Sequence, residues 1–224
     1  FTRSEMMMME MLSTNEWQRP MYFAVTIGND YHLGLDPYLE LTGLAYRITP
    51  ERSADGRPRV NTEVMYDNML HKFKYGNMNV PGIYIDENTM RMCRTHRMMF
   101  MELAEALYNE GKHDKCLEVL DFAEEMLPGY NIPYDYTSAT MASYYYELGE
   151  MEKGNAIMTK VADNCAEYME WGASLLKEQR ASAQSTLQHQ MAVLGYVLQN
   201  LERYQQKELF NYYYDIYAQY AAMR

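Results

Sequence analysis

Cysteine is scarce in this chain of 224 residues, which has only three. Cys93, Cys116 and Cys165 are an odd number and form no CxxC pair, so the sequence indicates neither a zinc site nor a disulfide framework. Cys116 and Cys165 fall on the apolar faces of expected helices. We therefore expect them to be buried as small hydrophobic side chains.

Basic residues are also few, with 20 Lys and Arg against 31 Asp and Glu, for a net charge of −11. Binding to phosphate groups needs concentrated Lys and Arg, so this balance excludes nucleic acid and an anionic membrane surface as partners. Residues 181–201 contain no Asp, Glu, Lys or Arg, but their glutamines make the stretch too polar to span a bilayer.

The recurring motifs of catalytic and nucleotide-binding sites are missing: GxGxxG, GxxxxGK[ST], HExxH, GxSxG and the EF-hand loop. Glu124 and Glu125 are adjacent on an expected helix and point roughly 100° apart, so they do not converge as a catalytic pair and are expected on solvent faces. We expect no catalysis by this chain, no cofactor and no metal. The histidines are dispersed and are expected at the surface or at helix caps: His32, His71, His96, His113 and His189.

Residues 98–128 form the clearest pattern in the chain, two antiparallel helices joined by a short turn at 109–113. Apolar residues recur at helical spacing on one face of each helix. Gly111 ends the first helix and Pro128 closes the second. These face residues are Leu103, Ala104, Leu107 and Tyr108, then Cys116, Leu117, Leu120, Ala123 and Leu127.

Small residues in this hairpin occur where the two helix axes must approach closely, as in a tetratricopeptide repeat, which the segment resembles. A second copy spans 136–166. Aligning Gly149 with Gly111 places Ala142 on Ala104 and Gly154 on Cys116. Its offset of 38 residues predicts a longer connection at 129–135 than the usual repeat has.

The predicted fold is mainly α, a tetratricopeptide-like α-α hairpin array with a small N-terminal α/β cap. The cap is expected at 1–87, with helices at 4–12 (capped by Ser4) and 62–73, a helical turn at 37–41, and a short two- or three-stranded sheet. Its strands are expected at 21–27, 43–49 and 83–86, where strand-forming residues are bounded by turn signals. Sustained helical periodicity predicts a helical-repeat region at 88–224. Because two strands are too few to be stable alone and the helix at 62–73 has an apolar face that needs cover, we expect one cooperative unit.

A second resemblance concerns three short motifs: N-x-W-x-R-P-x-Y-F-A at 15–24, GLAYR at 43–47, and Y-x-D-E-N at 84–88. They resemble the soluble tail of a multi-spanning membrane family of Gram-negative bacteria. The membrane part of that family resembles protein O-mannosyltransferases. The resemblance implies that these residues lie on the periplasmic side of the inner membrane. It also implies that the membrane half, with its acidic catalytic loop, is absent from this sequence.

The tetratricopeptide resemblance implies that the first helix of each hairpin lines a concave face. This face offers a tyrosine, a carboxylate and small polar groups, which suit an extended peptide. The alternative is that the C-terminal helices fold back and fill the groove. The candidate partner-binding residues are Met101, Glu105, Tyr108 and Asn109 in the first unit and Ala139, Ser143, Tyr146 and Glu147 in the second.

Two other clusters have more than one reading. Arg91 and Arg94 share a helix face in a basic cluster with His96 and Arg97, and either grip a carboxylate or phosphate or form a solvated stripe. The tyrosine-rich segments 144–149 and 211–217 either stack on sugar or pack in the core.

Three functional hypotheses remain from the sequence. The chain is a non-catalytic module of a membrane glycosyltransferase-like protein that binds a partner or acceptor polypeptide, a carbohydrate-binding or enzymatic domain in its own right, or a free-standing repeat adaptor. The expected partner is a protein or peptide, with a glycan as the second candidate. We expect the membrane to be involved only through an N-terminal part that precedes Phe1.

Overall fold

The computed structural model describes residues 2–221, with only the backbone of Lys177, and divides the chain into two compact units, 1–76 and 77–224. The protein is mainly helical and has a small sheet near its N-terminus, which confirms the predicted fold class. The predicted domain boundary at 87/88 and the single cooperative unfolding transition stay predictions.

The sheet of the first unit has four short strands, so the prediction of two or three was wrong. The segment at 39–41, expected to be helical, pairs as a strand because its helical turn ends at Tyr38. Residues 83–86 form no strand. The order is β1-β3-β2-β4, with β3 antiparallel to both neighbours and β4 parallel to β2. The strands are β1 Tyr22–Ala24, β2 Leu39–Leu41, β3 Ala45–Ile48 and β4 Arg59–Val60.

The helices of the first unit start at side-chain caps. Thr2, rather than the expected Ser4, caps α1, and Asn61 accepts a hydrogen bond from the Val64 amide at the start of α2. Met8 and Leu12 of α1 pack on a buried core made of Phe23, Leu39 and Ile48. The elements are α1 Arg3–Asn15, the 3₁₀ turns η1 Asn29–Tyr31 and η2 Asp36–Tyr38, α2 Thr62–Asp67, and the π-helical turn η3 Asn68–Lys72.

His32 lies in the interior of this unit and is the C-cap residue of η1, so of the two expected places, the surface or a helix cap, it takes the cap. Its side chain is 1% exposed, and its ring lies 5.2 Å from that of Phe23 and 5.7 Å from that of Tyr46. Its Nδ1 lies 2.8 Å from Asp36 Oδ1. The imidazole is thus held by aromatic contacts and one carboxylate.

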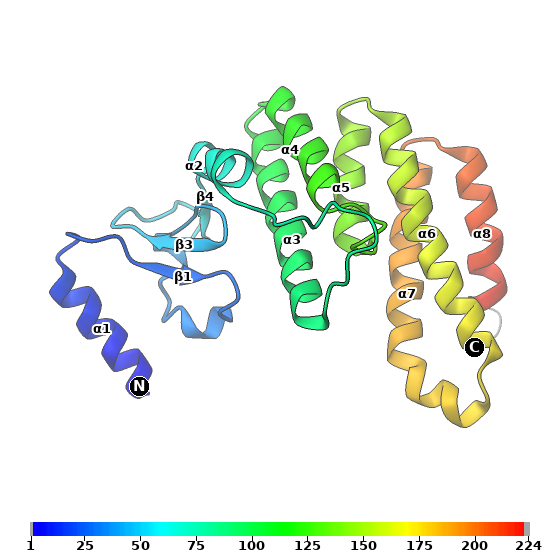
Figure 1. Ribbon diagram of the computed structural model, residues 1–224, viewed down its shortest axis with the longest axis horizontal. Helices are drawn as coiled ribbons and strands as arrows, with labels where there is room; N and C mark the ends of the chain where they lie inside the picture. Colours follow the sequence, from blue (N-terminus) through cyan, green and yellow to red (C-terminus); the bar gives the residue numbers. More distant parts are fainter. Residues whose placement is uncertain (1, 222–224) are drawn as a thin grey trace. The chain divides into compact units, whose positions relative to one another are not determined.

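The second unit consists of three antiparallel helical hairpins that follow one another along the chain (Figure 1). The first helices of successive hairpins, α3, α5 and α7, contact one another, and α6 packs on both α7 and α8. The helices are α3 Glu87–Asn109, α4 His113–Met126, α5 Tyr136–Glu147, α6 Met151–Ser174, α7 Lys177–Arg203 and α8 Lys207–Ala221.

All three hairpins turn with the same hydrogen bonds. In each, one left-handed residue follows the first helix, and the next amide bonds to the carbonyl five residues earlier, which is a Schellman turn. The left-handed residues are Gly111, Gly149 and Gln205. The bonds are Lys112 N to Leu107 O at 2.9 Å, Glu150 N to Tyr145 O at 2.8 Å, and Gln206 N to Leu201 O at 2.8 Å.

Arg97 fixes the connection between the first two hairpins from inside the fold. It is 1% exposed and donates hydrogen bonds to three carbonyl oxygens of that connection, those of Leu127 (2.9 Å), Ile132 (2.8 Å) and Pro133 (2.9 Å). Burial lowers the pKa of Arg97. Arg97 is therefore a structural residue and no part of an exposed basic cluster, whereas Arg91 and Arg94 are exposed.

Candidate binding surfaces

The residues expected to line the groove divide into three groups. Glu105, Asn109 and Glu147 are exposed; Met101, Tyr108 and Ser143 are half-buried; Ala139 and Tyr146 are buried. Six of the eight side chains therefore reach the surface. We call the side of the second unit formed by the first helices α3, α5 and α7 the first-helix face.

Tyr146 points into the second hairpin and away from the first-helix face. A Cβ atom on Gly154 would lie 2.5 Å from its ring, and its hydroxyl donates to Asn155 Oδ1 at 2.7 Å. The ring of Tyr204, just after α7, lies 4.7 Å away. Tyr146 and Ala139 therefore do not contact a partner directly, and they support the face from inside.

Glu147 connects the ends of the three first helices. Its carboxylate accepts hydrogen bonds from Tyr108 (3.3 Å), Arg203 (2.7 Å) and Tyr204 (2.6 Å). Tyr108 belongs to α3, Arg203 is the last residue of α7 and Tyr204 follows it, whereas Glu147 ends α5. The cluster therefore holds the three hairpins in register. Arg203 stands at the position in the third hairpin that Glu147 occupies in the second. Arg203 could have been found in the sequence by aligning Gln205 with Gly149.

Two carboxylates of α3, Glu102 and Glu105, act electrostatically on Tyr144 of the neighbouring helix α5. Glu102 and Glu105 of α3 both raise the pKa of Tyr144, as does Tyr196 of α7, after the larger effect of burial. Burial and the charge of Glu105 raise the pKa of Glu102. Within residues 2–221, neither glutamate forms an ion pair.

The groove hypothesis fails if Tyr108 and Tyr146 are both fully buried against residues 181–223, and this condition is not met. Tyr146 is buried, but Tyr108 is half-buried, stacks on His113 at 5.0 Å and lies 5.5 Å from Tyr144. Helix α7 extends the face, because the ring of its Tyr196 lies 4.7 Å from that of Tyr136.

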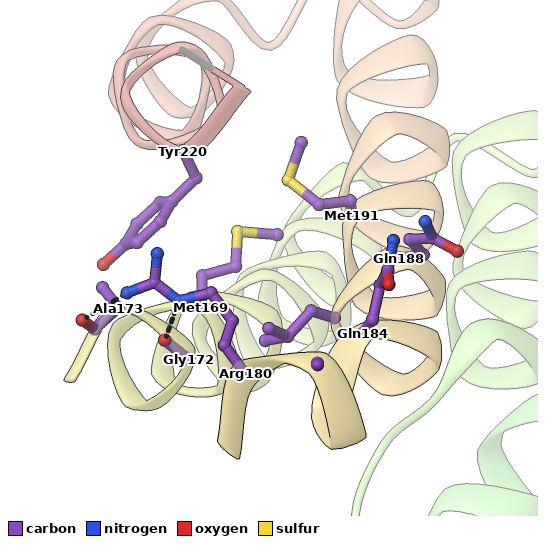
Figure 2. A pocket seen from close by; sticks show the side chains of 10 residues that line it. Met169, Gly172, Ala173, Arg180, Gln184, Gln188, Met191 and Tyr220 are labelled. Atoms are coloured by element: carbon purple, nitrogen blue, oxygen red, sulfur yellow. Dashed lines mark hydrogen bonds between the residues drawn. The ribbon is translucent and has the colours of Figure 1, made fainter. Parts of the chain in front are cut away.

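A cavity of about 550 Å³ lies among α6, α7 and α8 (Figure 2). Met169 and Met191 line it, and Tyr220 of α8 reaches over it. The Arg180 guanidinium at its edge donates to the carbonyls of Gly172 (3.2 Å) and Ala173 (3.0 Å), as Figure 2 shows for Gly172. Arg180 thus caps the last turn of α6, and the rest of the cavity is mostly apolar.

A larger cavity, of about 650 Å³, lies between α4 and α6 beside the connection from α4 to α5. We call it the α4–α6 cavity. Tyrosines, carboxylates, lysines and an amide line it: Asp121, Glu124, Tyr130, Tyr134, Tyr145, Lys153, Lys160 and Asn164, with Pro128, Gly129, Ala156 and Ile157. This cavity was not predictable from the sequence, because its residues are scattered over four segments that only the hairpin packing brings together.

The tyrosine-rich segments supply both core and surface. Tyr145, Tyr146 and Tyr213 are buried, whereas Tyr212 and Tyr214 are exposed.

Glu124 was expected on a solvent face but is half-buried, with its Oε2 accepting a hydrogen bond from the Tyr134 hydroxyl at 2.5 Å. All three cysteines are buried, which confirms the expectation for Cys116 and Cys165.

No three His, Cys, Asp or Glu side chains between residues 2 and 221 are grouped so that they could hold a metal ion. In the same stretch, none of the helices combines the length and the apolar character that a membrane span requires.

Comparison with known proteins finds a similar family for the N-terminal part of the chain. Residues 1–69 match the family model TMEM260-associated domain 2. The first unit is thus similar to a domain associated with a TMEM260-like family. Neither the curated proteins nor the solved structures gave a significant match.

Proposed function

We propose that the second unit is a non-catalytic module that binds an extended polypeptide on the first-helix face. We also propose that its hairpins are tetratricopeptide-like repeats. The three identical Schellman turns support the repeat, because stacked hairpins of one geometry give a continuous surface from their first helices. Such surfaces suit extended peptides.

The observation that carries the proposal is the pair of carboxylates Glu102 and Glu105 on α3, whose charges act on Tyr144 of α5, the helix that packs against α3. Within the described chain these carboxylates lack a cationic partner, and tyrosine offers a flat apolar wall with a polar tip. A polypeptide with Lys or Arg side chains supplies the missing charge. Its aliphatic side-chain stems pack on the tyrosine rings.

The match of residues 1–69 to a TMEM260-associated domain supports the wider context that we propose for the chain. In this proposal residues 1–224 are a periplasmic region of a membrane glycosyltransferase-like protein. The module holds a partner or acceptor polypeptide there, and the chemistry is done elsewhere in the parent protein. This context favours the proposal over a free-standing repeat adaptor.

The test of the binding proposal uses residues 1–224 and a library of extended peptides that vary in Lys and Arg content, with binding followed by fluorescence anisotropy. We expect basic peptides to bind, and we expect Glu105→Gln to weaken binding about three- to tenfold, as the loss of one hydrogen bond of ordinary strength does. Glu170→Gln, an exposed glutamate of α6, is the matched control and should change nothing.

Peptide binding that does not depend on Glu105, or no binding by any basic peptide, would contradict the proposal. The proposed location is tested separately. An alkaline phosphatase fused after residue 224 of the intact parent protein should be active in bacterial cells only if this region is periplasmic.

A further inference from the structure

The α4–α6 cavity has an aromatic wall that is fixed on three sides. The Tyr134 ring lies on Gly129, where a Cβ atom would come within 2.4 Å of it. The Arg97 guanidinium lies 5.3 Å from the ring centroid, and the Tyr134 hydroxyl is bound by Glu124. These contacts hold the ring in place before a ligand enters. Binding therefore costs little further conformational entropy of the Tyr134 side chain.

Polar groups of both kinds surround this wall. Asp121 accepts hydrogen bonds from the Tyr145 hydroxyl (2.9 Å) and from Lys153 Nζ (2.7 and 2.8 Å). Asn164 donates to the Tyr134 carbonyl at 3.2 Å, and its own side-chain oxygen faces no donor within the described residues. Lys160 is exposed at the rim of the cavity.

Glu124 provides a second acceptor. Only its Oε2 is engaged, by Tyr134, and its Oε1 accepts no hydrogen bond from residues 2–221. Burial is the main cause that raises the pKa of Glu124, and the hydrogen bond from Tyr134 and the charge of Arg97 oppose it. A half-buried carboxylate oxygen without a donor lowers its free energy by accepting a hydrogen bond from a ligand hydroxyl.

The charges of the cavity balance. Asp121 and Glu124 face Lys153 and Lys160 across it, so neither a strongly anionic nor a strongly cationic ligand is favoured. The remaining lining is apolar or aromatic: Tyr130, Tyr134, Tyr145, Pro128, Ala156 and Ile157. A ligand that fits must be neutral, must have one apolar face, and must both donate and accept hydrogen bonds around its edge.

We propose that the α4–α6 cavity is a binding site for a neutral pyranose unit of a glycan, with Tyr134 as its aromatic wall and with Glu124, Asn164 and Lys160 as hydrogen-bond partners of the sugar hydroxyls. A pyranose ring has an apolar face of C–H groups and an edge of hydroxyls, which meets each of these requirements. The site uses α4, α6 and the connection at 128–134, so it does not depend on peptide binding at the first-helix face.

The test is titration of ¹⁵N-labelled residues 1–224 with the methyl glycosides of glucose, galactose, mannose and N-acetylglucosamine at millimolar concentration, followed by NMR. We expect at least one glycoside to shift amide signals of residues 121–134 and 153–164. Glu124→Gln should weaken this binding about tenfold and Lys160→Met about threefold, because Glu124 is half-buried whereas water competes for the hydrogen bond of the exposed Lys160.

Glu125→Gln is the matched control, because Glu125 is the exposed neighbour of Glu124 on the same helix and the substitution removes the same charge. It should leave the affinity unchanged. Lys160 is exposed, so its substitution keeps the test valid even if Glu124→Gln alters the fold.

Three outcomes would overturn the proposal. They are the absence of shifts at these residues with all four glycosides, equal effects of Glu124→Gln and Glu125→Gln, and tighter binding of inorganic phosphate that is lost in Lys160→Met. The last result would identify an anion site instead.

Discussion

The Arg97 guanidinium on α3 donates a hydrogen bond to the carbonyl of Ile132, 2.8 Å away in the connection between α4 and α5. Because Ile132 and Arg97 are both buried, no water competes for this bond. The same side chain also binds the carbonyls of Leu127 and Pro133. One planar group thus satisfies three backbone acceptors, and it fixes the wall of the α4–α6 cavity.

We expect Arg97→Met to lower the free energy of unfolding by about 3–5 kcal/mol, because it leaves buried carbonyls without a donor. The free energy of unfolding of Arg97→Lys should lie between those of the unsubstituted protein and Arg97→Met. An ammonium group keeps the charge but cannot reach three acceptors that are arranged around a planar guanidinium. Urea unfolding measures both. Arg94→Met, an exposed position one turn earlier on α3, is the control and should change the stability by less than about 0.5 kcal/mol.

A close contact between Gly154 and Tyr146 holds α5 against α6. A Cβ atom at Gly154 would lie 2.5 Å from the Tyr146 ring, so we expect Gly154→Ala to destabilise the protein by about 1–3 kcal/mol through overpacking. At Gly195 in α7 the nearest atom, on Tyr217, is 3.9 Å away. Gly195→Ala should therefore stabilise the protein by about 0.4–1 kcal/mol. Thermal unfolding of both variants tests the contact, and a stabilising Gly154→Ala would contradict it.

The periodic parts of the chain were predictable from the sequence, because apolar residues at helical spacing mark the buried face of an amphipathic helix. Gly111 and Gly149 located the first two turns, since only glycine reaches the left-handed region without cost. The third turn was missed because Gln205 takes the same conformation and carries no such signal. Strand β4 was missed for a related reason: its two residues are too few to show alternation.

The sites were harder to predict than the elements that carry them. Glu147 was found from the repeat, but its partners Arg203 and Tyr204 come from a hairpin that the repeat pattern did not cover. Arg97 was read as exposed because a charged residue on a helix usually is. Its burial depends on the carbonyls of a connection about 35 residues away, which no local pattern encodes.

The three hairpin turns have the same geometry, but the left-handed residue is glycine in the first two and Gln205 in the third. Gln205 has a φ of 59°, where a side chain is strained and glycine is not. We expect Gln205→Gly to raise the free energy of unfolding by about 1 kcal/mol, and Gly149→Ala, at the equivalent position, to lower it by a similar amount. Chemical denaturation measures both. A destabilising Gln205→Gly would show that the third turn differs from the other two.

The last prediction concerns the charge of Glu102. Its pKa is raised, first by burial and then by Glu105 three residues along α3, so its ionised form is less favourable in the folded than in the unfolded protein. The sign follows from linkage: ionised Glu102 lowers the stability above its folded-state pKa, and this loss disappears as the pH falls toward the unfolded value. We expect Glu102→Gln to stabilise the protein at pH 7 by about 0.2–0.5 kcal/mol, the size of a like-charge helix pair. The gain should vanish near pH 4, below which both forms are neutral. Thermal melts of the two proteins across this range measure it, with Glu170→Gln as the exposed control. A gain that persists unchanged at low pH would mean that packing, and not charge, is its cause.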